Sequence, residues 1–104
     1  MKEKTMTRSP AKLHVHIYDN CEVDCQAVNV SKQAGDEIEW HSANEAFTVQ
    51  FESSPFKDDT FPVPAGGSIG SGPIKDNASE DTYHYAVRSA NLAMSADPDV
   101  NVKK

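Results

Sequence analysis

Five side chains in this 104-residue sequence could form a metal-binding face: the four histidines, His14, His16, His41 and His84, together with Glu39. His14 and His16 are two residues apart, so in an extended strand they share one face at roughly 6.6 Å separation. Neutral imidazoles together with a carboxylate suit zinc, copper(II) or nickel. A metal-binding histidine face is therefore one hypothesis. The alternative is that these side chains point outward only because that face is solvated.

The two cysteines, Cys21 and Cys25, have the spacing CxxxC. In an extended chain their Cα atoms would lie roughly 13 Å apart, beyond the ~7 Å limit for a disulfide, so a bridge requires a turn between them. A redox CxxC pair or a zinc ribbon needs other spacing or a second pair. Two reduced thiols and one local disulfide both remain open.

Catalytic sequence motifs are absent. The chain has no GxSxG, HExxH, P-loop or GxGxxG pattern and no cysteine close to a histidine in a nucleophilic arrangement. Its carboxylates gather in turns such as Asp58-Asp59 and Glu80-Asp81, where solvation explains them. We therefore expect that the protein is not an enzyme.

The stretch 37–51, EIEWHSANEAFTVQF, contains two short runs in which apolar and polar residues alternate. Such alternation predicts strands with one dry and one wet side. The predicted inward residues are Ile38, Trp40, Phe47, Val49 and Phe51, and the predicted outward ones are Glu37, Glu39 and His41. A polar turn separates the two strands, which form either a β-hairpin or a β-arch.

Further strands are predicted at residues 12–18, 27–30, 82–88 and 100–102, and residues 68–74 could form a short strand weakened by two glycines. Between Phe51 and Gly67 several prolines exclude a long helix and a central strand, so we expect an irregular crossing segment. Phe56, Phe61 and Val63 within it are predicted to plug one open end of the fold. About seven strands and no helix predict an all-β, Greek-key β-sandwich.

Length and composition favour one soluble domain at residues 11–104, after a polar tail at 1–10 that we expect to be disordered. The net charge of −6 argues against nucleic acid, and no apolar run could span a bilayer. We expect a monomer. The polar start lacks a signal peptide, which predicts a cytoplasmic protein, or a periplasmic one if the N-terminus is processed or recloned.

Four pieces of the sequence together resemble the cupredoxin superfamily, which includes plastocyanin and azurin. They are a Gly-Asp turn into IEW, the strand FTVQF, the strand YHYAV and the closing DPDVNV, and the resemblance covers residues 13–102. It implies a cupredoxin-like sandwich. It also implies that the strands carrying His14, His41 and His84 lie in one sheet with these side chains on its wet side.

Cupredoxins hold blue copper with two histidines, a cysteine and usually a methionine. The resemblance puts the first histidine position at Phe47 and the cysteine position at Val87, while residues 88–92 contain no histidine. Met94 lies within a residue or two of the methionine position, but a thioether alone binds copper poorly. The resemblance therefore implies a domain without type 1 copper or another cofactor. We expect a non-catalytic module that binds an unknown protein or small molecule, with metal binding at the histidine face as the alternative.

Overall fold

The computed structural model describes residues 11–18, 21–89 and 98–103. These residues form eight strands: β1 (Lys12–Ile17), β2 (Ala27–Ser31), β3 (Glu37–Ser42), β4 (Phe47–Phe51), β5 (Thr60–Val63), β6 (Ser68–Gly70), β7 (Thr82–Ser89) and β8 (Asp99–Lys103). The described residues contain no helix, and therefore none that is long and apolar enough to cross a membrane. The predicted tail at 1–10 and Met94 lie outside the described part of the chain.

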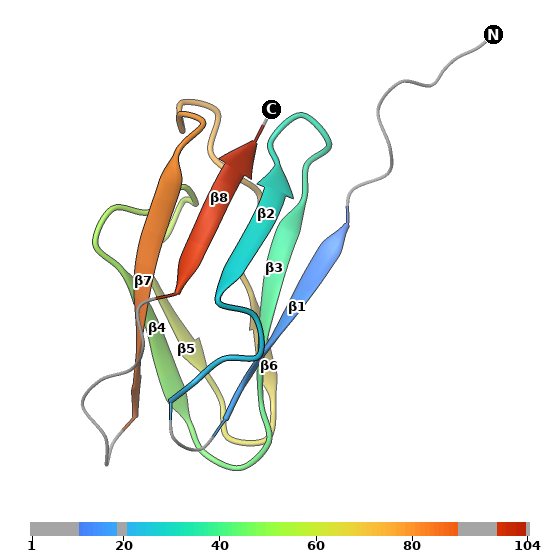
Figure 1. Cartoon of the computed structure of the whole chain (residues 1–104). Helices are drawn as coiled ribbons and strands as arrows, with labels where there is room; N and C mark the ends of the chain where they lie inside the picture. The colour runs from blue at the N-terminus through green and yellow to red at the C-terminus, as the bar shows by residue number, and fades with distance from the viewer. Residues whose placement is uncertain (1–10, 19–20, 90–97, 104) are drawn as a thin grey trace, which may run out of the picture.

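The strands form two packed sheets, one with the order β1-β3-β6 and one with the order β2-β8-β7-β4-β5 (Figure 1). Strands β1 and β3 run parallel, as do β2 and β8, while the other pairs are antiparallel. Strands that are distant in sequence are neighbours in both sheets, as Greek-key connections require. The prediction of an all-β sandwich is confirmed.

The core is formed by the residues that alternation predicted to point inward. Trp40 of β3 is fully buried, and its ring lies 5.0–6.5 Å from four other aromatic rings, those of Phe51, Phe56, Phe61 and Tyr85. Trp40 belongs to the three-stranded sheet, whereas Phe51, Phe61 and Tyr85 belong to the five-stranded one. Since β3 and β4 lie in different sheets, the segment 37–51 is a β-arch.

Two segments differ from the prediction. Residues 60–63, expected to be irregular, form strand β5, which pairs with β4 at one edge of the five-stranded sheet. An edge strand tolerates Pro62 because one side of it needs no N–H donor. Strand β6 ends at Gly70, earlier than expected, and Ile74 forms an isolated bridge with Phe56 instead.

Both cysteines are free thiols in this structure. Cys21 is fully buried in the core, and Cys25 is half-buried with its Sγ 3.1 Å from the carbonyl oxygen of Ala27, to which it donates. The loop between β1 and β2 folds back onto the end of β1, where Val23 forms a bridge with Ile17.

Candidate metal centre

The parallel pairing of β1 and β3 brings four of the five candidate side chains together. In this register His14 lies beside Glu39, and His16 lies beside His41. The residues between them, such as Val15 and Trp40, are fully buried. Because side chains alternate across a strand, all four polar residues project from the outer face of the three-stranded sheet.

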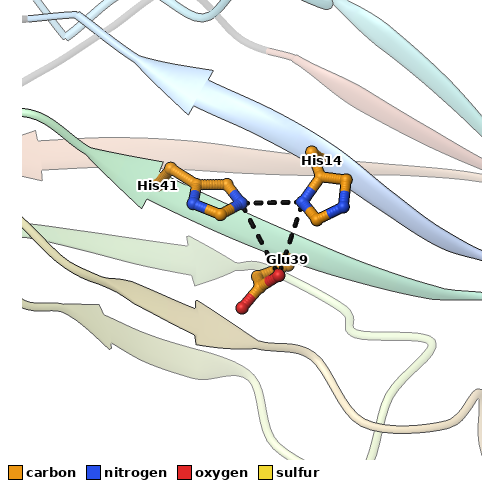
Figure 2. Close-up of side chains that lie close together, drawn as sticks. All are labelled: His14, Glu39 and His41. Carbon is orange, nitrogen blue, oxygen red and sulfur yellow. Dashed lines mark hydrogen bonds and ion pairs between the residues drawn. The ribbon is translucent and has the colours of Figure 1, made fainter.

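Three of these side chains direct donor atoms toward one point (Figure 2). Nδ1 of His14 lies 2.8 Å from Nε2 of His41. Oε1 of Glu39 lies 3.4 Å from the first of these nitrogens and 3.6 Å from the second. A tetrahedral zinc ion with bonds of about 2.0–2.1 Å holds its ligands roughly 3.3–3.4 Å apart. The two distances that involve Glu39 are close to this spacing, whereas the two imidazole nitrogens are hydrogen-bonded at 2.8 Å and must move apart by about 0.5 Å to share an ion.

Glu39 is held by a contact on its other oxygen. Its Oε2 accepts a hydrogen bond of 3.0 Å from the hydroxyl of Ser68, which is the neighbour of His41 on strand β6. This bond fixes the carboxylate so that Oε1 is left for a metal ion. Hydrogen bonds from neighbouring residues to a metal ligand commonly orient that ligand toward the metal ion. Sequence reasoning missed Ser68, because no motif connects it with residue 39.

The cluster is accessible from solvent. The exposed fraction of the side chain is 52% for His14, 28% for His41 and 23% for Glu39. An ion can therefore reach the site without a change in the backbone. The net charge of −6 favours the approach of cations to the chain.

His16 stands beside this cluster and is outside it. Its ring stacks on that of His41, with centroids 4.8 Å apart and planes 20° apart. In the described part of the chain, the group whose donor atoms all lie within 4.8 Å of one another consists of His14, Glu39 and His41.

The prediction that His84 shares this face is wrong. His84 lies on β7 in the five-stranded sheet, where its Nδ1 is 2.5 Å from Oδ1 of Asp99 on β8. It does point outward, as alternation predicted, and it is exposed. Alternation distinguishes inward from outward but does not say which of two sheets a strand joins, and each sheet has its own wet face.

The end of the sandwich where β4 begins holds a pocket of about 740 Å³. Phe47, Val63 and Ile69 contribute apolar surface to it, and Arg88 also lines it. Phe47 and Val87, at the ligand positions that the resemblance assigns, are both buried. Of the three residues predicted to plug one open end of the fold, Val63 lines this pocket, whereas Phe56 and Phe61 pack in the aromatic core around Trp40.

No known protein family and no curated protein matches the chain. Solved structures do resemble it. An oxidized mutant of amicyanin superposes with a TM-score of 0.61 at 16% identity, over 91% of this chain and 92% of that one. A chain from the cryo-EM structure of a heme-copper terminal oxidase dimer gives a TM-score of 0.58 at 7% identity, over 99% of this chain and 76% of that one. The chain thus has a cupredoxin-like fold.

Proposed function

We propose that this protein is a non-catalytic cupredoxin-like domain that binds a divalent transition metal on the outer face of its three-stranded sheet. The observation that carries the proposal is the placement of three donor atoms, from His14, Glu39 and His41, at 2.8–3.6 Å from one another. Two imidazoles and one carboxylate form a donor set that suits zinc and copper(II). Zinc is the ion to test first, because histidine and carboxylate ligands are common in zinc sites and the two distances from Glu39 are close to its ligand spacing.

The residues at the positions of the cupredoxin copper ligands support the absence of type 1 copper. Phe47 and Val87 carry no donor atom, and both are packed in the core. A type 1 site needs a thiolate and two imidazoles at one copper ion. We therefore expect that copper(II) added to the protein gives only weak visible absorption, from nitrogen and oxygen ligands. An intense thiolate-to-copper band would contradict this part of the proposal.

Thermal unfolding with and without zinc tests the metal site. An ion that binds only the folded state stabilises it by mass action, by about 2.7 kcal/mol at a free concentration of 100 Kd. We expect zinc to raise the melting temperature of a Cys25→Ser background, which removes the accessible thiol. The increase should be lost when His14→Ala and His41→Ala are combined.

Two matched controls make the result specific. His84→Ala removes a histidine from the other sheet, and Glu37→Gln removes a carboxylate two residues from Glu39 on the same strand. Both variants should keep the full zinc response, whereas Glu39→Gln should lose most of it. A zinc response that survives without both His14 and His41, or its absence in the background protein, would refute the proposed site.

The pocket at the end of the sandwich favours a second candidate function, the binding of a small molecule or a protein partner. Its lining is largely apolar and includes the partly buried side chain of Ile69. An apolar fluorescent dye should then bind the folded protein, and Ile69→Asp should abolish that binding while leaving the zinc response intact. Equal dye binding by both proteins would count against this second function.

A further inference from the structure

We propose that His16 is the fourth ligand of the metal ion, so that the bound ion clamps strand β1 to strand β3 in a closed site. This inference rests on the proposed function and adds a residue and a consequence to it. Three ligands leave one position of a four-coordinate zinc ion unfilled. The structure places one further imidazole, that of His16, beside the ring of His41.

The place of His16 in the sheet supports this role. It is the cross-strand neighbour of His41, and His14 is the cross-strand neighbour of Glu39, so the four residues form a two-by-two patch on one face. The ring of His16 already touches the ring of His41 by stacking. To bind the ion, His16 would have to leave this stacked position and turn a ring nitrogen toward the three other donors.

The side chain of His16 is able to move while its backbone is held. Its ring is exposed, and among the described residues no hydrogen bond to the ring competes with a metal. The backbone N–H of His16 donates to Oδ1 of Asp24 at 2.9 Å, and the N–H of Asp24 donates to the carbonyl oxygen of His16 at 3.0 Å. These bonds fix the strand and also cover its outer edge, which prevents another strand from pairing there.

The consequence follows from how the ligands are distributed. His14 and His16 come from β1, and Glu39 and His41 come from β3, so the ion would join two strands that are distant in sequence. Among the eight strands that the structure describes, β1 lies at the edge of its sheet and pairs with β3. A site filled by four protein ligands keeps no open position for a substrate, as in structural zinc sites. The clamp thus agrees with a non-catalytic role.

The zinc affinity of His16→Ala tests the inference, with His84→Ala as the matched control and Cys25→Ser as the common background. We expect His16→Ala to lower the affinity by roughly tenfold or more, and His84→Ala to leave it unchanged. Free imidazole should restore part of the affinity to His16→Ala, because it fills the vacated position, and should not do so for the background protein. Cobalt(II) should give a tetrahedral absorption spectrum in the background protein and a weaker one in His16→Ala.

Hydrogen exchange adds a readout of the clamp. Zinc should slow amide exchange along β1 more than along β8, and the difference should shrink in His16→Ala.

His16→Gln provides a second variant in case the alanine variant folds poorly. Unchanged affinity in either folded variant would overturn the inference while leaving the three-ligand site intact. A zinc-dependent dimer that disappears in His16→Ala would also overturn it, because the fourth ligand would then come from a second copy. If the Cys25→Ser background protein itself does not bind zinc, the proposed function is refuted.

Discussion

Glu39 uses its two carboxylate oxygens for different purposes. Oε2 accepts the hydrogen bond from Ser68, while Oε1 faces the imidazoles of His14 and His41. Without this bond, a carboxylate on an exposed sheet face would sample several orientations, and metal binding would have to restrict them at a cost in side-chain entropy. The bond to Ser68 restricts the carboxylate already in the metal-free protein, so that metal binding does not bear this cost. The hydroxyl of Ser68 therefore prepares the site before an ion arrives.

This arrangement predicts that Ser68→Ala weakens zinc binding by roughly 10- to 100-fold, the usual effect of losing a contact behind a metal ligand. Since Ser68 is exposed, the melting temperature of the metal-free protein should hardly change. Calorimetric titration with zinc measures the first quantity and thermal unfolding the second. Ser53→Ala, at another exposed serine, is the control. Equal zinc affinity for both variants would show that the Ser68 contact does not orient the carboxylate.

Tyr85 shows how burial changes an acid in the aromatic core. Burial raises the pKa of Tyr85 to about 12, and the nearby indole of Trp40 acts in the opposite direction. Neither the phenol oxygen of Tyr85 nor Nε1 of Trp40 has a hydrogen-bond partner among the described residues. The ionised phenolate is therefore poorly tolerated in the folded protein.

The expected pH dependence follows from this shift. In the unfolded chain the phenol loses its proton near pH 10, and in the folded protein only near pH 12. The contribution of Tyr85 to stability is thus complete below pH 10 and declines by roughly 2–3 kcal/mol as the pH rises to about 12. Urea unfolding between pH 8 and 11.5 should show a smaller decline for Tyr85→Phe than for the parent. Parallel declines in both proteins would contradict the assignment, and Tyr18→Phe, at an exposed tyrosine, is the control.

At the scale of elements, one buried carboxylate joins the ends of three strands. Asp36 is fully buried just before β3. Its Oδ1 accepts from the N–H of Ala11 before β1 at 3.0 Å, and its Oδ2 accepts from the N–H of Ser31 at the end of β2 at 2.9 Å. The Gly-Asp turn that contributed to the cupredoxin resemblance therefore has a structural reason for its aspartate.

We expect Asp36→Asn to destabilise the fold by about 2–3 kcal/mol. The amide supplies one oxygen where two are used, and its NH2 group would face a buried N–H donor. Chemical denaturation measures the loss, and Asp76→Asn, at an exposed turn residue, should cost almost nothing. A stability equal to that of the parent would show that these hydrogen bonds contribute little.

Alternation predicted most elements because each strand has one buried and one solvated side. It placed Ile38, Trp40 and Val49 in the core correctly. It missed β5, because an edge strand can contain proline and its sequence then resembles a loop. The local sequence pattern could not decide between a β-hairpin and a β-arch at residues 37–51, since that depends on which sheet β4 joins.

At the scale of the whole molecule, the sheet topology determines which polar side chains lie next to one another. His14 and Glu39 are 25 residues apart in sequence, and only the parallel register of β1 and β3 makes them neighbours. His84 is excluded for the same reason, because its strand belongs to the opposite layer. Sequence could thus supply the set of outward histidines, whereas the sheet topology selects the members that can share one ion.

Trp40 makes the two layers one cooperative unit. It is fully buried on β3, and its ring packs against side chains from β4, β5 and β7 of the other sheet. Its emission should therefore be blue-shifted in the folded protein and move to the red on unfolding. Small domains of this size usually unfold in a single step. Stabilising one sheet should then stabilise the other as well.

This coupling gives the last prediction. Zinc bound on the outer face of the three-stranded sheet should raise the unfolding midpoint reported by Trp40 fluorescence and the midpoint reported by far-UV circular dichroism by the same amount. Far-UV dichroism is the needed comparison, because the five-stranded sheet holds most of the strands and therefore dominates that signal. His84→Ala should behave as the parent does, since it leaves the zinc ligands in place. Two separate transitions, with zinc shifting only one of them, would mean that the sheets unfold independently and that the contacts of Trp40 do not join them.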